Sequence, residues 1–96
     1  MSVILRDAQR GEKNFGLGSA TRADAELLGE AWVGAEARQS ESDANILISK
    51  DGLRQYRSPS EKPNSSQATT GVQANFESRD VPGGKWIRNG HLDILP

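Results

Sequence analysis

Residues 71–79 alternate between two kinds of side chain, and this alternation constrains the fold more than any other feature of the sequence. The even positions are small or apolar: Val72, Ala74, Phe76 and Ser78. The odd positions are all polar: Gln73, Asn75, Glu77 and Arg79. Successive side chains of a β-strand point to opposite faces of its sheet. The pattern therefore predicts a strand that packs one face against a helix and presents a polar face as a candidate reaction surface.

A helix is predicted earlier in the chain, over residues 22–38, because apolar residues recur there at spacings of three and four. Ser19 or Thr21 is expected to cap its N-terminus. Asp24 follows Thr21 by three residues, as in a capping box, and an acidic first turn favours the helix dipole. The expected core anchors of this helix are Leu27, Leu28 and Trp32.

Further strands are indicated on both sides of residues 71–79. They are expected over residues 46–49, 53–57, 85–88 and 91–95. Asp51-Gly52 and Asn89-Gly90 are hairpin signals between the members of each pair. The sequence thus predicts an α+β domain, with one or more N-terminal helices packed on an antiparallel sheet of about five strands.

Two segments are expected to be irregular. Residues 1–18 contain Gly16 and Gly18 in a polar setting, which favours a flexible N-terminal arm or linker and leaves residues 19–96 as the folded domain. Residues 58–70 are rich in proline, serine and threonine, so we expect a long loop that is either mobile or functional.

The composition excludes several kinds of site. The 96 residues include no cysteine, which rules out a disulfide scaffold, a thiolate zinc site and a cysteine nucleophile. The longest apolar run is only a few residues, so no membrane span or signal peptide is expected. With a single histidine, a metal nuclease would need clustered carboxylates, and residues 50–91 hold only four acidic side chains.

Charge is distributed unevenly along the chain, although the net charge is −1. Residues 1–49 carry five basic and eight acidic side chains, whereas residues 50–91 carry seven basic and four acidic ones. A basic half suits a surface that faces a polyanion, but ordinary solvated charge explains the same counts. Both interpretations stay open at this point.

Three segments of the chain are similar to a known family: DGLRQYRSPSEKPN (51–64), ATTGVQANFE (68–77) and GKWIRNGHLDI (84–94). They resemble the C-terminal tRNase toxin domains of contact-dependent growth inhibition effectors, over about residues 15–94. The resemblance implies a ribonuclease of the barnase, EndoU, colicin and RelE structural group. It also implies a secreted or cell-surface effector that acts in the target-cell cytoplasm and is neutralised by a cognate immunity protein.

RNA cleavage without a metal needs a base for the 2′-hydroxyl, an acid for the 5′-oxygen and stabilisation of the charged transition state. Histidine titrates near neutral pH, and His91 is the only one in the chain. Glu77 or Tyr56 is the expected second proton-handling group. Thr70, where the long loop enters the strand, completes the candidate catalytic set. The competing interpretation of His91 is a surface histidine at the start of a strand.

Phosphate or RNA binding is expected from side chains with cationic or hydrogen-bonding groups. The candidates are Arg54, Arg57, Lys62, Thr69, Asn75, Arg79, Lys85 and Arg88. Within residues 53–57, strand alternation places Arg54 and Tyr56 on one face and Arg57 on the other. No cofactor is expected.

The alternative function is a non-catalytic RNA- or protein-binding α+β module of a secreted adhesin. RNA-binding sheets usually display stacking aromatic residues, and only Tyr56 and Trp86 are available here, which favours catalysis. The expected partners are a tRNA substrate, an immunity protein with an acidic surface that covers residues 62–88, and an activating host factor.

Overall fold

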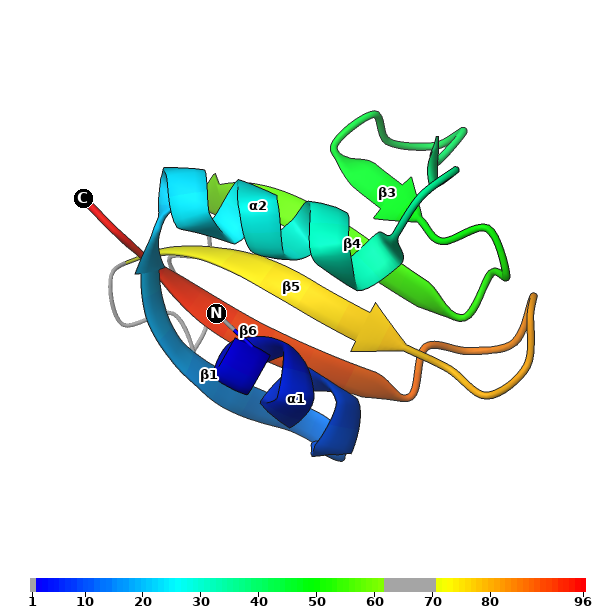
Figure 1. Ribbon diagram of the computed structural model, residues 1–96, viewed down its shortest axis with the longest axis horizontal. Coiled ribbons are helices and arrows are strands. Elements are labelled where there is room, and N and C mark those ends of the chain that lie inside the picture. The colour runs from blue at the N-terminus through cyan, green and yellow to red at the C-terminus, as the bar shows by residue number, and fades with distance from the viewer. Residues whose placement is uncertain (1, 62–70) are drawn as a thin grey trace.

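Strand β5 (Val72–Ser78) forms as the alternation predicts and lies inside the sheet, between β4 and β6. A computed structural model describes residues 2–61 and 71–96, which form two helices and one six-stranded sheet. Both helices cover the same face of the sheet (Figure 1). The other elements are α1 (Ser2–Arg10), β1 (Lys13–Thr21), α2 (Arg22–Val33), β2 (Arg38–Gln39), β3 (Ile46–Ile48), β4 (Arg54–Glu61) and β6 (Arg88–Leu95).

The sheet has the order β1-β6-β5-β4-β3-β2, and its strands from β6 to β2 pair antiparallel. This confirms the α+β class and the hairpin formed by β3 and β4. Strand β1 pairs in parallel with β6, so the sheet is mixed and has six strands, where about five antiparallel ones were expected. The additional edge strand β2 consists of only two residues, which is too short to leave a pattern in the sequence.

The core fills the space between the sheet and α2. Phe76 of β5 contacts both Trp32 of α2, edge to face at 6.1 Å between ring centroids, and Tyr56 of β4 at 5.1 Å. Leu28 is buried beside them, which confirms Leu28 and Trp32 as anchors. Leu27, however, is 53% exposed, because it lies on the opposite side of the helix; its expected role in the core was wrong.

Helix α2 starts where the sequence predicts and ends earlier. The Thr21 hydroxyl accepts a hydrogen bond from the Asp24 backbone N–H at 3.2 Å, which confirms the cap. The helix ends at Val33 rather than at residue 38, because Gly34 adopts a φ of 77° and its N–H bonds the Glu30 carbonyl oxygen. Neither described helix is both long and apolar enough to cross a membrane.

The expected flexible arm over residues 1–18 is wrong for the described residues of that segment. They form α1, whose Ala8 is fully buried, and most of β1, whose Leu17 and Phe15 pack on the core cluster. The glycines do not prevent a strand, because β1 is irregular between Gly16 and Ser19, where its register with β6 shifts.

The predictions of a hairpin at Asn89-Gly90 and of a separate strand over residues 85–88 are also wrong. Both Asn89 and Gly90 lie within the continuous strand β6. A Cβ added at Gly90 would lie 2.7 Å from Leu17 Cδ1, so glycine is required for the close approach of the neighbouring β1 rather than for a turn.

The expected loop over residues 58–70 is wrong for its first four residues, which belong to β4. Strand β4 continues to Glu61, with an irregularity in its pairing between Arg57 and Ser60. Residues 62–70, which include the candidates Lys62, Thr69 and Thr70, lie outside the described residues.

Gly29 provides a test of the packing between α2 and the sheet. A Cβ at this position would collide with the Tyr56 ring. Gly29→Ala is therefore expected to lower the free energy of unfolding by about 1–3 kcal/mol, even though alanine is intrinsically favoured over glycine in a helix by about 1 kcal/mol. Urea denaturation measures the change.

The matched control is Leu27→Ala on the exposed side of α2, which should shift the free energy of unfolding by no more than about 0.5 kcal/mol. A Gly29→Ala protein as stable as the wild type would contradict the tight packing of α2 on Tyr56.

Candidate functional site

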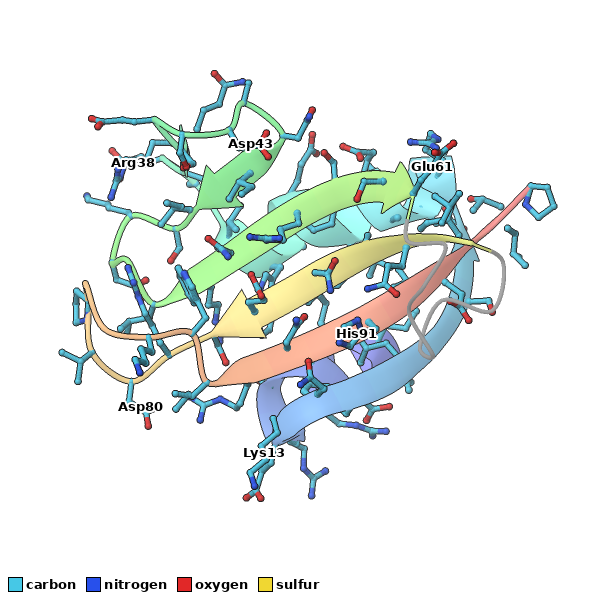
Figure 2. All side chains as sticks on the ribbon, turned by 180° about the vertical axis from the view of Figure 1, so that it is seen from behind. Lys13, Arg38, Asp43, Glu61, Asp80 and His91 are labelled. Carbon is cyan, nitrogen blue, oxygen red and sulfur yellow. The ribbon has the colours of Figure 1, made fainter. Side chains whose placement is uncertain are left out.

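The face of the sheet opposite the helices carries a continuous group of polar side chains, which we call the polar sheet face. Figure 2 views this face, with His91 near its centre and the helices behind the sheet. Strand register places its members side by side: Gln73 faces Asp93, Asn75 faces His91 and Glu77 faces Asn89. Its members are Asn14, Gln55, Arg57, Gln73, Asn75, Glu77, Asn89, His91 and Asp93.

The central side chains of this face are buried although no helix covers them. Gln73, Asn75 and Glu77 are each less than 9% exposed, because β5 lies between two strands that also carry long polar side chains. Among the described residues, no buried side-chain nitrogen or oxygen lacks a hydrogen-bond partner. A fully satisfied polar network of this kind holds its groups in fixed positions.

His91 is held by amides from two neighbouring strands. Its Nδ1 lies 2.5 Å from Gln73 Nε2 and 3.2 Å from Asn75 Nδ2, so it accepts from these amides. Its Nε2 lies 3.0 Å from Asn14 Oδ1 of β1 and donates to it. These partners select the neutral tautomer that carries its proton on Nε2. Asn75 also donates to Asn89 Oδ1 at 2.9 Å.

Glu77 is held by two side chains of β4. Gln55 Nε2 donates a short hydrogen bond to Glu77 Oε2, and Arg57 Nε lies 3.4 Å from the same oxygen. Glu77 and His91 occupy diagonal positions on adjacent strands, because Glu77 faces Asn89, two residues before His91. Diagonal neighbours in a sheet are about 7–8 Å apart. A carboxylate, a guanidinium and an imidazole therefore share one patch of the polar sheet face.

Tyr56, a candidate proton-handling group, and Arg54, a candidate phosphate ligand, do not belong to this patch, because both lie on the helix side of the sheet. Tyr56 is buried under α2, where its hydroxyl lies 3.2 Å from Glu26 Oε1. Burial, and then the charge of Glu26, raise the pKa of Tyr56, so it stays protonated. The Arg54 guanidinium lies over the Trp32 ring at 4.5 Å.

Two further arginines are tied to backbone and side-chain partners at the end of the sheet. Arg79 donates to the carbonyl oxygens of Gly52 and Gly84, each at 2.7 Å. Arg88 bonds Ser78 Oγ at 2.8 Å and Asp80 Oδ1 at 2.6 Å. Lys85 is exposed in the loop between β5 and β6. Of the described cationic candidates, only Arg57 lies on the polar sheet face.

Sequence reasoning placed Gln73 on the polar face but missed three members that contact Glu77, His91 or Asn75 directly: Asn14, Gln55 and Asn89. Gln55 had a signal, because strand alternation places it with Arg57. Asn14 and Asn89 had none, since one lay in the expected arm and the other in the expected turn.

No three histidine or carboxylate side chains of the described residues are grouped so that they could hold a metal ion. A cavity of about 660 Å³ lies elsewhere, between the start of α2 and the end of β6, and is largely apolar. Its lining includes Arg22, Val72 and Ile94 but none of the polar sheet face.

Comparison of the chain with protein-family models, with curated proteins and with solved structures finds no match.

The placement of Tyr56 can be tested by pH, because Tyr56 is the only tyrosine. Its phenol ionises near pH ~10 when the chain is unfolded, and its pKa is raised in the fold. The contribution of the protonated Tyr56 phenol to the free energy of unfolding is therefore complete below pH ~10 and is lost as the pH rises above that value. Ultraviolet titration should show no tyrosinate in the folded protein near pH ~10.

The control is Tyr56→Phe. This substitution should lower the free energy of unfolding by about 1 kcal/mol at neutral pH, because the hydrogen bond to Glu26 is lost. Its stability should also fall less than that of the wild type between pH ~8 and pH ~11. A tyrosinate spectrum that appears near pH ~10 without unfolding would contradict the buried position.

Proposed function

We propose that this chain is a metal-independent ribonuclease that cleaves tRNA, with its active site on the polar sheet face. One observation carries the proposal: Glu77, Arg57 and His91 lie on the same helix-free face, with Glu77 and His91 at diagonal positions of β5 and β6. A carboxylate, an imidazole and a cation are the groups that phosphodiester transesterification requires.

Each of the three residues has one role in the proposed reaction. The Glu77 carboxylate removes the proton of the ribose 2′-hydroxyl, and the 2′-oxygen attacks phosphorus. The bond from phosphorus to the 5′-oxygen breaks, and that oxygen leaves with a proton from the protonated form of His91, which thereby becomes neutral. Arg57 stabilises the negative charge that gathers on the phosphate oxygens. The products are a 2′,3′-cyclic phosphate and a 5′-hydroxyl, so atoms and charges balance without a metal.

The amides around His91 suit a residue that changes its protonation state. Nδ1 of neutral His91 accepts from Gln73 and Asn75. When His91 is protonated, Nδ1 becomes a donor, and the Gln73 amide can turn by 180° to present its oxygen instead. Asn75 stays as it is, because its amide nitrogen also donates to Asn89 Oδ1. On the other side of the ring, Asn14 lies on an edge strand and is exposed, so a substrate oxygen can replace its carbonyl as the partner of Nε2.

The substrate and the biological setting in this proposal come from the resemblance of residues 51–64, 68–77 and 84–94 to tRNase toxin domains. On that basis the chain acts as an antibacterial toxin in the cytoplasm of a target cell. Its partners are tRNA and a cognate immunity protein. The α+β class with a helix-covered sheet is compatible with the barnase, EndoU, colicin and RelE group.

A non-catalytic RNA-binding module is the second candidate, and one observation favours it. Both ring nitrogens of His91 are already hydrogen-bonded to amides. Such a network also occurs where a histidine only organises a polar surface. Cleavage assays separate the two candidates, because a binding module retains RNA without producing cyclic phosphate ends.

The decisive experiment incubates the purified protein with total tRNA in excess EDTA and examines the fragment ends. Wild type is expected to produce 2′,3′-cyclic phosphates. Glu77→Gln and His91→Ala should each lower the cleavage rate by about 10²- to 10⁴-fold, the usual contribution of one general base or acid. Bacteria that express either variant should grow, whereas expression of the wild-type protein should inhibit growth.

Glu26→Gln is the matched control for Glu77→Gln, since it makes the same change on the helix side of the sheet, where Glu26 contacts Tyr56. Its cleavage rate should equal that of the wild type. Intact tRNA in EDTA, or full activity of folded Glu77→Gln and His91→Ala, would overturn the proposed mechanism. RNA that is bound but never cut would establish the binding module.

A further inference from the structure

We propose that Trp86 is a stacking platform for one unpaired nucleobase of the substrate, placed next to the polar sheet face by Arg79. The choice of RNA as the ligand rests on the proposed function. The inference goes further because it predicts where on the protein a base is held and which part of an RNA can be cut.

Trp86 is the aromatic side chain that the fold leaves outside its core. The chain has five aromatic residues, and all are described. Trp32, Tyr56 and Phe76 are buried between α2 and the sheet, and Phe15 packs against the same core cluster. Trp86 is half-buried and lies in the loop between β5 and β6. A nucleobase that stacks on this protein would therefore stack on Trp86.

The Trp86 ring is held from one side by an immobilised guanidinium. The Arg79 guanidinium carbon lies 4.0 Å from the ring centroid. The same guanidinium donates to Gly52 and Gly84 carbonyl oxygens at 2.7 Å, which ties it to the β3–β4 turn as well as to its own loop. A ring that is already fixed loses little conformational entropy when a base stacks on it.

The second face and the edge of the indole are suited to a ligand. Trp86 Nε1 makes no hydrogen bond among the described residues, whereas Trp32 Nε1 donates to two backbone carbonyl oxygens. Lys85, the neighbouring residue, is exposed and has no ion pair in the part of the chain that the structure describes. Two adjacent residues thus offer a ring face on which a base can stack, an indole N–H donor and an exposed ammonium for a phosphate.

Arg79, which holds the Trp86 ring, is close along the chain to the proposed reaction centre. Arg79 follows Glu77 by two residues, and its N–H bonds the Leu53 carbonyl oxygen, so the extended backbone continues past the end of β5. Two extended residues span about 6.7 Å. A base on Trp86 therefore places the phosphodiester of the adjacent nucleotide near Glu77 and Arg57.

The platform restricts the substrate to unpaired nucleotides. In an RNA helix both faces of each base are covered by its neighbours, so only a loop, bulge or end can offer a face to Trp86. We therefore expect cleavage in a single-stranded region of the tRNA, next to the base that Trp86 holds.

A non-cleavable probe tests the platform separately from catalysis. The probe is a 2′-O-methyl oligoribonucleotide, which lacks the attacking hydroxyl. Trp86 fluorescence should be quenched when this single strand is added, and not when the same strand is annealed to its complement. The fluorescence of Trp32 serves as the internal reference, because Trp32 is buried.

Substitutions then identify the ring. Trp86→Ala should weaken binding of the single strand at least fivefold, the smallest effect usual for loss of one stacked base. Trp86→Phe, which keeps a ring, should bind within about threefold of wild type without the fluorescence change. Val81→Ser, at an exposed apolar position of the same loop, is the matched control and should bind as wild type does.

The outcomes for the platform and for catalysis are distinguishable. Equal binding by wild type and folded Trp86→Ala, equal quenching by the duplex, or no binding of the single strand would overturn the platform. Cleavage of tRNA in any of those cases would leave the proposed ribonuclease intact. Quenching and Trp86-dependent binding without cleavage of natural RNA would support the platform and overturn the proposed ribonuclease.

Discussion

The indole N–H of Trp32 connects the core of this protein to its polar face. It donates to the backbone carbonyl oxygens of Gln55 and Glu77, at 3.1 and 3.2 Å, from the helix side of the sheet. The side chains of these two residues form the pair on the opposite side. The Trp32 ring also packs edge to face on Phe76. Movement of α2 would therefore disturb β4 and β5 at the point where Glu77, the proposed general base, is held.

Burial of the polar side chains on β5 has a cost that the network offsets. A buried amide without a partner costs about 1–3 kcal/mol, and the described residues leave no such group. The same bonds fix the orientation of Glu77 and His91 in the absence of substrate. Catalytic groups that are already in place need no reorganisation during the reaction, which is the main advantage of electrostatic catalysis over reaction in water.

Local patterns in the sequence predicted the parts of the fold that depend on local physics. The alternation in residues 71–79 and the cap at Thr21 are confirmed, as each depends on residues at most a few positions apart. The turn expected at Asn89-Gly90 is absent, because Gly90 serves a tertiary contact with Leu17 that local sequence does not reveal. The arrangement of the candidate site was predicted only in part: alternation put Glu77 on a polar face, but only the register of β4 against β5 shows that Arg57 shares this face and Tyr56 does not.

The contacts that the arginines make reduce the number of basic side chains in residues 50–91 that are available to bind a polyanion. Arg54, Arg79 and Arg88 are engaged with an indole ring, backbone carbonyls or an acidic partner, and they stabilise the end of the sheet. Within the described residues, this leaves Arg57 and Lys85 as the cations best placed to contact a phosphate near the proposed site. Non-specific polyelectrolyte attraction scales with the number of phosphates neutralised. The proposed recognition of RNA on this surface would therefore depend more on shape, hydrogen bonds and stacking than the charge count of the sequence indicates.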